Sequence, residues 1–433
     1  MANNKGSMPN DGVIRKGDYL PVGKKTILGL QHVFTMFGAT VLVPLLTGLN
    51  TSVALFGAGV GTLIFHFITK GKVPAFLGSS FAFIPVIIAV GMMGGAEQGS
   101  AEYVANLQYA QGGLVLAGIV YVILALIIKL VGPELITSLF PPIVTGPVIM
   151  VIGLNLAPTA IDMASAHWPL AIICLLAVTA VNIFGKGFIK VLPVISGLIV
   201  GYIVAIIFKE VDFAIINEAK WFAVPAFTMA KFDVQALTII APVAIVTMVE
   251  HIGDVLAISA TVEEDFAKDP GIHRTLMGDG VATAVAGLIG APANTTYGEN
   301  TGVLALTKVW DPQIMRIAAG FAIVIAFIGK IGAIINTIPV AVVGGISIIL
   351  FGMIAAIGVR TVVENQVDFK ESRNLIIAAV ILVLGIGGAM FELKIGNATL
   401  QFAGMALAAI FGIILNKVLP ADSSNAQTET KAE

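Results

Sequence analysis

The sequence APANTTYGENTGVLALTK, residues 291–308, decides how this chain folds, because it places a carboxylate where a regular membrane helix is hard to form. Glu299 stands among Gly, Thr and Asn, which weaken helices and allow extended backbone. Unpaired backbone groups and ionisable side chains at membrane depth are tolerated only against protein or a cavity. The stretch therefore predicts a broken helix beside a polar site. Glu299 is expected at the N-terminus of a helix that begins near Asn300, where the helix dipole favours negative charge.

The composition predicts a polytopic membrane protein. Of 433 residues, 57% are hydrophobic and 12% are charged, and the mean hydropathy is +0.97. Soluble domains carry about 25% charged residues. The net charge of −2 gives no footprint for nucleic acid, and the single Cys174 allows no disulfide framework. No metal-ligand spacing, phosphate-binding loop or catalytic constellation is present, so we expect no metal, no cofactor and no enzyme activity.

A membrane span needs about 20 mostly apolar residues, and fewer where a helix is broken. This criterion gives fourteen expected segments, of which the third and tenth are short, rich in small or polar residues and least helix-like. The first seven are 27–47, 52–69, 75–92, 111–131, 138–157, 168–185 and 191–208, and the second seven are 236–258, 276–290, 293–307, 313–333, 338–358, 373–390 and 400–418.

Lys and Arg residues predict the orientation of these spans. With both termini in the cytoplasm, the cytoplasmic tails and loops hold 19 of the 24 basic residues, as the positive-inside rule requires. The N-terminus is polar and lacks the apolar core of a cleavable signal. We therefore expect a multi-pass protein of the cell membrane with two cytoplasmic tails.

Sequence landmarks recur at about half the length of the chain. LQHVF at 30–34 is echoed by VEHIG at 249–253, and GVGT at 59–62 by GVAT at 280–283, offsets of 219 (32 to 251) and 221 (59 to 280). PAFLGSSFAF at 74–83 parallels PANTTYGEN at 292–300, and FPPIVTGPVIMVIG resembles IPVAVVGGISIILFG. Seven spans per half is an odd number, so the halves enter the membrane with opposite orientations. This pattern is typical of secondary transporters, which bind substrate between matching broken helices.

Further carboxylates lie in the stretch IVTMVEHIGDVLAIS. Glu250 and Asp254 are four residues apart and share one helix face. Repulsion and desolvation favour protonation of at least one of them, which suits a proton-coupling role. His251 points about 100° away; it orients the helix or takes part in the proton step.

With these residues in hand, the chain resembles the nucleobase–ascorbate transporter family, also called nucleobase:cation symporter-2, in its bacterial uracil permease branch. The motifs LQHVFTMFGATVLVP, GKVPAFLGSSFAFI and NTTYGENTGVLALTKV carry the resemblance, and the last holds the family signature from Glu299 to Lys308. The resemblance implies short antiparallel strands in segments three and ten, a substrate-holding core, and a gate that also makes homodimer contacts. The implied division is 1–26 cytoplasmic tail, 27–136 core, 137–210 gate, 211–235 extracellular loop, 236–335 core, 336–418 gate and 419–433 cytoplasmic tail.

The resemblance also implies the substrate site. Glu250 and Glu299 would hydrogen-bond a pyrimidine and Phe81 would stack on the ring. Four further positions complete the expected site: Gly298 and Tyr297 with strand backbone, and Ala39 and Phe351 in the lining. Uracil fits this chemistry, because carboxylates accept from ring N–H groups, backbone N–H groups answer C=O groups, and an aromatic ring covers the flat face.

The sequence departs from the family at two positions. Asp254 stands where close bacterial relatives often have His, which leaves the identity of the proton carrier open, and Phe351 replaces a Tyr found in some relatives. Glu rather than Gln at position 299 favours uracil over purines. The expected function is uracil:proton symport by alternating access, with a xanthine permease as the alternative. An anion transporter of the sulfate-permease type fits less well, since an anion site would not use two carboxylates, and a passive channel does not need broken helices with paired acids.

Overall fold

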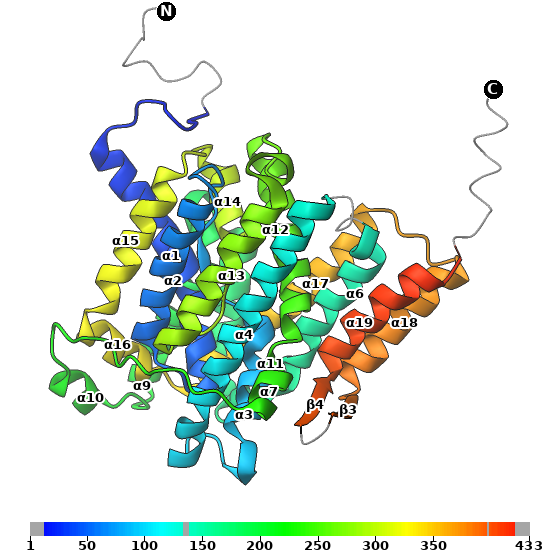
Figure 1. The fold of residues 1–433 in the computed structure, drawn as a ribbon. Helices are drawn as coiled ribbons and strands as arrows, with labels where there is room; N and C mark the ends of the chain where they lie inside the picture. The colour runs from blue at the N-terminus through cyan, green and yellow to red at the C-terminus, as the bar shows by residue number, and fades with distance from the viewer. Residues whose placement is uncertain (1–12, 133–137, 396–397, 421–433) are drawn as a thin grey trace, which may run out of the picture.

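The computed structural model describes residues 13–132, 138–395 and 398–420 of the chain. It is a bundle of roughly parallel and antiparallel helices with two small sheets (Figure 1). Residues 1–12 of the predicted N-terminal tail and residues 421–433 of the predicted C-terminal tail lie outside the described residues. The principal helices and strands are α1 (Val22–Thr47), α2 (Thr51–Ile68), β1 (Leu77–Ser79), η1 (Phe81–Phe83), α3 (Ile84–Gly91), α4 (Ala101–Val131), α6 (Pro142–Asn155), α7 (Ala157–Ser165), α8 (Trp168–Phe184), η3 (Gly187–Val191), α9 (Pro193–Ile207), α10 (Phe213–Glu218), α11 (Val234–Ile240), α12 (Val243–Val262), α13 (Ile272–Ile289), β2 (Asn294–Thr296), α14 (Gly298–Thr307), α15 (Gln313–Ala326), α16 (Gly329–Asn336), α17 (Val340–Glu364), α18 (Ser372–Ile386), β3 (Met390–Ile395), β4 (Ala398–Ala403) and α19 (Gly404–Val418).

Many of these helices have the length and composition of membrane spans. Within the described part of the chain, six stretches qualify as full spans by these criteria, with mean hydropathies between 1.6 and 2.9, and shorter apolar helices of 10–17 residues accompany them. The six are Val22–Thr47, Thr51–Ile68, Ala101–Val131, Pro142–Ser165, Val234–Val262 and Val340–Glu364. The chain is therefore a multi-pass membrane protein, as the composition predicted.

The third and tenth predicted segments are broken, as their small and polar residues indicated. In the first broken segment, β1 leads through η1 into α3; in the second, β2 leads into α14. The two strands pair antiparallel, with Leu77 opposite Thr296 and Ser79 opposite Asn294. The predicted pair of short strands is thus present, and it lies where two shortened helices begin.

Glycines at matching places in the two halves allow close helix packing. A Cβ on Gly59 of α2 would lie 2.7 Å from the carbonyl oxygen of Ala319 in α15. A Cβ on Gly280 of α13 would lie 2.8 Å from the carbonyl oxygen of Gly118 in α4. Contacts this short exclude a side chain, so α2 packs on α15, and α13 on α4, through bare backbone. The landmarks GVGT and GVAT therefore have the same packing role.

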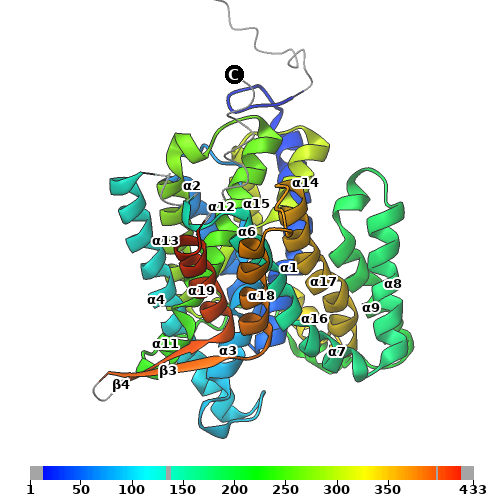
Figure 2. The same cartoon turned by 90° about the vertical axis from the view of Figure 1, so that its right-hand side faces the viewer.

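Two predicted spans are interrupted and two end in strands. Segment 236–258 is divided at Pro242, which lacks the N–H that a helix interior uses. Segment 313–333 is divided at Phe327 and Ile328. Segment 373–390 ends at β3 and segment 400–418 begins within β4. The ring centroids of Phe391 and Phe402 on these paired strands are 6.5 Å apart. This hairpin lies beside α11 at one end of the bundle (Figure 2). The apolar-window criterion predicted helix at both of its ends.

Candidate functional site

Two threonine hydroxyls hold the paired strands in place. The hydroxyl of Thr62 in α2 accepts from the N–H of Leu77 at 2.9 Å and donates to its carbonyl at 3.3 Å. The hydroxyl of Thr283 in α13 does the same for Asn294, at 3.2 and 3.0 Å. All four residues are buried. Because the two threonines end the matching landmarks GVGT and GVAT, each half supports its own strand in the same way.

The second broken segment presents Glu299 in the first turn of α14. Tyr297, just before this helix, is buried and faces the other strand: its hydroxyl donates to the carbonyl of Ser79 at 3.0 Å, and its N–H donates to the carbonyl of Phe76 at 3.2 Å. Tyr297 therefore joins the two strands, while the carboxylate two residues later lies at the positive end of a helix dipole.

Helix α12 brings two more carboxylates to the same strand. Asp254 accepts a hydrogen bond from the hydroxyl of Thr296, the last residue of β2, at 2.9 Å. Its other oxygen lies 3.7 Å from the place that a Cβ on Gly298 would occupy. Glu250 lies one turn earlier on α12, and this helix packs against α14, whose first turn holds Glu299. The three predicted carboxylates are therefore neighbours.

A further buried carboxylate was not predicted. Asp279 of α13 is fully buried, and one of its oxygens lies 3.2 Å from Nδ1 of His251, whose side chain has no solvent exposure either. The same His251 nitrogen lies 3.5 Å from the hydroxyl of Thr296. His251 thus faces α13 and β2, and the edge of its ring meets Phe65. The sequence does indicate Asp279 as a candidate, because it is an ionisable residue within an apolar stretch, MGDGV.

Two aromatic rings stand close together near the first broken segment. Phe81, the first residue of η1, meets Phe351 of α17 edge to face, with ring centroids 6.1 Å apart. Both side chains are buried. Ala39 is buried on α1 beside Thr40, whose hydroxyl lies 3.4 Å from that of Tyr297 and whose carbonyl accepts from Ser79. The predicted lining residues thus surround the same pair of strands.

Several buried polar atoms near the strands have no hydrogen-bond partner among the described residues. They include Oε2 of Glu250, Oγ of Ser80, and both amide atoms of Asn300. Within the described part of the chain, no Lys or Arg forms an ion pair with Glu250, Asp254 or Glu299. Buried polar groups are almost always hydrogen-bonded, so this cluster is suited to a small polar ligand. No group of three His, Cys, Asp or Glu among the described residues is arranged to hold a metal ion.

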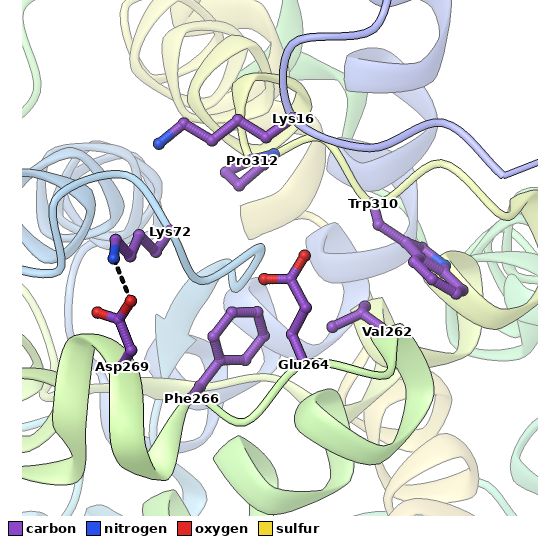
Figure 3. A pocket seen from close by; sticks show the side chains of 8 residues that line it. All are labelled: Lys16, Lys72, Val262, Glu264, Phe266, Asp269, Trp310 and Pro312. Atoms are coloured by element: carbon purple, nitrogen blue, oxygen red, sulfur yellow. Dashed lines mark hydrogen bonds and ion pairs between the residues drawn. The ribbon is translucent and has the colours of Figure 1, made fainter. Parts of the chain in front are cut away.

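A cavity of about 210 Å³ lies elsewhere, beside Lys16 near the start of the described chain (Figure 3). It contains none of the predicted site residues. Figure 3 shows Lys72 turned toward Asp269 and Glu264 pointing into the open space between the loops. The full lining is Lys16, Lys72, Val262, Glu264, Phe266, Asp269, Trp310 and Pro312. Because Glu264 and Trp310 come after the far ends of α12 and α14, the cavity is separate from the carboxylate cluster.

Comparison with known proteins shows the family to which this chain belongs. A family profile described as the permease family, covering xanthine and uracil permeases, matches residues 23–393. The chain belongs to this permease family, nucleobase:cation symporter-2. Uracil permeases of Bacillus caldolyticus and Bacillus subtilis are 45% and 46% identical over 426 and 410 residues, covering 95% and 90% of this chain and 95% and 91% of theirs. A putative pyrimidine permease of Escherichia coli is 40% identical, covering 96% of this chain and 94% of its own length. A permease is a transporter, not an enzyme.

Solved structures support the fold of this permease. The anion transporter SLC26A9 superposes with a TM-score of 0.68 at 11% identity over 92% of this chain, which spans 65% of that chain. The transmembrane domain of the cyanobacterial bicarbonate transporter BicA gives a TM-score of 0.58 at 15% identity, covering 93% of this chain and 99% of that domain. At these identities the likeness concerns the fold alone, which is that of membrane transporters.

Proposed function

We propose that this permease imports uracil together with protons by alternating access. The observation that carries the proposal is that Glu250 of α12 and Glu299 of α14 lie on two packed elements of a broken-helix site and have no cationic partner among the described residues. Relatives named uracil permease, at 43–46% identity over most of the chain, support uracil as the substrate.

The residues around the strands match the edges and the face of uracil. The ring has two N–H donors, which the carboxylates of Glu250 and Glu299 accept. Its carbonyl oxygens are answered by backbone N–H groups at the start of α14, where the helix dipole favours them. Phe81 covers the flat face, and Phe351 supports Phe81 edge to face. Gly298 keeps the approach to Asp254 free of a side chain.

We assign the coupled proton to the pair of carboxylates on α12. Glu250 contacts the substrate and Asp254 lies one turn away, bound to the strand through Thr296. Burying an isolated charge is costly, so a carboxylate without a cation is stabilised by a proton or by a ligand donor. His251 is assigned the linking role, since its pairing with Asp279 joins α12 to α13.

The architecture that we propose has fourteen spans in two inverted repeats of seven. The equal roles of Thr62 and Thr283, and of Gly59 and Gly280, support the repeat. Spans one to four and eight to eleven form the core, and the remaining spans form the gate, through which two copies associate as a homodimer. Both termini lie in the cytoplasm, in the cell membrane.

The test is uptake of radiolabelled uracil into proteoliposomes with and without an inward proton gradient. We expect accumulation above equilibrium only with the gradient, and inhibition by unlabelled uracil but not by xanthine. Equal uptake without a gradient would remove the proton coupling. Competition by xanthine at the same concentrations as uracil would favour the purine alternative.

A further inference from the structure

The segment of residues 219–233, which we call the belt, joins α10 to α11 and crosses the end of the bundle opposite the beginning of α1 (Figure 1). It has no helix of its own over most of its length. The belt lies within residues 211–235, which the sequence predicts to be an extracellular loop. The proposed transport function does not use it.

The inner edge of the belt is fixed to several core helices by backbone hydrogen bonds. The N–H of Ala223 donates to the carbonyl of Phe327 at 3.0 Å, and the carbonyl of Trp221 accepts from the N–H of Gly329 at 3.0 Å. These partners lie at the break between α15 and α16, where the helix leaves its own backbone groups unpaired. The belt satisfies them, as buried backbone groups require.

Further contacts continue along the belt. The N–H of Lys231 donates to the carbonyl of Gln108 in α4 at 2.9 Å, and the ring of Phe227 meets Phe56 of α2 at 5.1 Å. The hydroxyl of Thr228 accepts from Gln111 at 2.8 Å. The belt therefore crosses the start of α2, the N-terminal part of α4 and the end of α15.

The outer edge of the belt is unusually apolar for an exposed loop. Five large side chains are between 61% and 81% exposed, and they are Trp221, Phe222, Val224, Met229 and Phe232. Two exposed lysines, Lys220 and Lys231, stand among them. Several large exposed apolar side chains within one short segment indicate a contact with another phase or molecule.

Position and composition together point to the lipid interface. The belt bonds to the C-terminal end of α13 and to the residue just past α15, two helices that expose the apolar side chains of Leu288 and Val324, at 41% and 60%. Tryptophan and other aromatic side chains gather at the level of the lipid headgroups, and lysine extends its ammonium group toward them. If the belt faced bulk water, all five of these apolar side chains would stay in contact with water.

We propose that the belt is an interfacial anchor, whose outer side chains Trp221, Phe222, Val224, Met229 and Phe232 insert among the headgroups and upper acyl chains of the adjacent leaflet. Its inner edge then holds the contacted parts of α2, α4 and α15 at a fixed depth. This inference depends on the chain being a membrane protein and not on the identity of its substrate.

Fluorescence of Trp221 tests the proposal directly. The chain has three tryptophans, and the double variant Trp168→Phe/Trp310→Phe leaves Trp221 alone. In vesicles, lipids brominated near the headgroup end of the acyl chain should quench this fluorescence strongly. Aqueous iodide should have little effect. The matched control, Trp168→Phe/Trp221→Phe, retains Trp310, which is 9% exposed under Arg15 and should respond weakly to both quenchers.

Two outcomes would overturn the proposal. Strong iodide quenching without lipid quenching would place the belt in water, and insensitivity to both would place Trp221 against a second copy of the chain. If the tryptophan variants fail to fold, Met229→Cys labelled with a polarity-sensitive dye gives the same reading, because Cys174 is buried and resists labelling. The dye should then report an apolar environment in vesicles.

Discussion

The two broken segments share a frame but differ in the residues just beyond each strand. Thr62 and Thr283 hold β1 and β2 in the same way, and the strands pair with each other. Beyond β1 the chain continues with the aromatic Phe81, whereas beyond β2 it continues with the carboxylate Glu299. One half therefore supplies the face of the site and the other supplies the hydrogen-bond acceptor. The two halves thus share the same strand support but contribute different side chains to the site.

The helices beside these segments differ in the same sense. The repeat, at an offset of 219, aligns Gln31 of α1 with Glu250 of α12, and Thr35 with Asp254. The first half thus has uncharged polar residues where the second half has acids. Proton coupling should accordingly depend on the second half alone.

The largest expected effect is on coupling, through Asp254→Asn. An amide keeps the shape and can still accept from Thr296, but it does not carry a proton at any working pH. Uracil binding should persist while accumulation driven by a pH gradient is lost. Accumulation and equilibrium binding are measured on the same preparation, with Thr35→Val as the matched first-half control, which should accumulate normally. If accumulation stays proportional to binding in Asp254→Asn, the residue is structural.

The shared frame predicts equal losses of stability from Thr62→Val and Thr283→Val. Each change leaves a buried strand N–H without its acceptor, which costs about 1–3 kcal/mol in the free energy of unfolding. The control is Thr47→Val, because this buried hydroxyl donates only to the carbonyl of Val43 within its own helix. Unfolding in detergent gives the comparison. A loss confined to one of the two threonines would show that the strands are not held equivalently.

The aromatic task of the first half predicts a smaller effect for Phe81→Leu. The substitution keeps the side chain apolar but removes the stacking surface and the edge contact with Phe351. Aromatic pairs contribute about 0.5–1.5 kcal/mol beyond burial, so uracil affinity should fall roughly 2- to 13-fold. Binding by competition with radiolabelled uracil measures this change. An unchanged affinity would remove Phe81 from the site.

The smallest effect concerns the exposed ion pair between Lys72 and Asp269, which lies outside the spans. The hydrogen bond from Lys72 lowers the pKa of Asp269, so the pair stabilises the fold above the ordinary carboxyl range and loses this contribution as the pH falls through the lowered pKa. Exposed pairs contribute little. Asp269→Asn should therefore unfold slightly more easily than the unchanged chain at pH 7, and the difference should vanish in acid. A difference that persists at pH 2 would contradict this assignment.

The sequence predicted the features that depend on local chemistry. Gly, Ser, Thr and Asn around Glu299 indicated a broken helix, and the strand pair was implied by the family resemblance. It did not predict partners that only the fold brings together, such as Thr283 with Asn294 or His251 with Asp279. Asp279 itself could have been predicted as a candidate site residue, because an aspartate between two glycines in an apolar stretch is an intramembrane ionisable residue.

The hairpin of β3 and β4 was missed for a different reason. Its residues include enough apolar side chains to extend the neighbouring helical windows, and hydropathy alone does not distinguish a strand from a helix over so short a run. Hydropathy does not predict the breaks at Pro242 and at Phe327, because the sequence stays apolar on both sides of each break.

The central claim is that Glu250 and Glu299 together accept the N–H groups of uracil, and equilibrium binding tests it most directly. Glu250→Gln and Glu299→Gln should each lower uracil affinity roughly 5- to 150-fold, because an amide must turn its own N–H₂ toward a ring donor. Glu264→Gln is the matched control: the same change just past the end of α12, at an exposed position in the separate cavity, should leave affinity unchanged. Binding of radiolabelled uracil to the three purified variants gives the answer. Wild-type affinity in either of the first two would remove that carboxylate from the site and contradict the account.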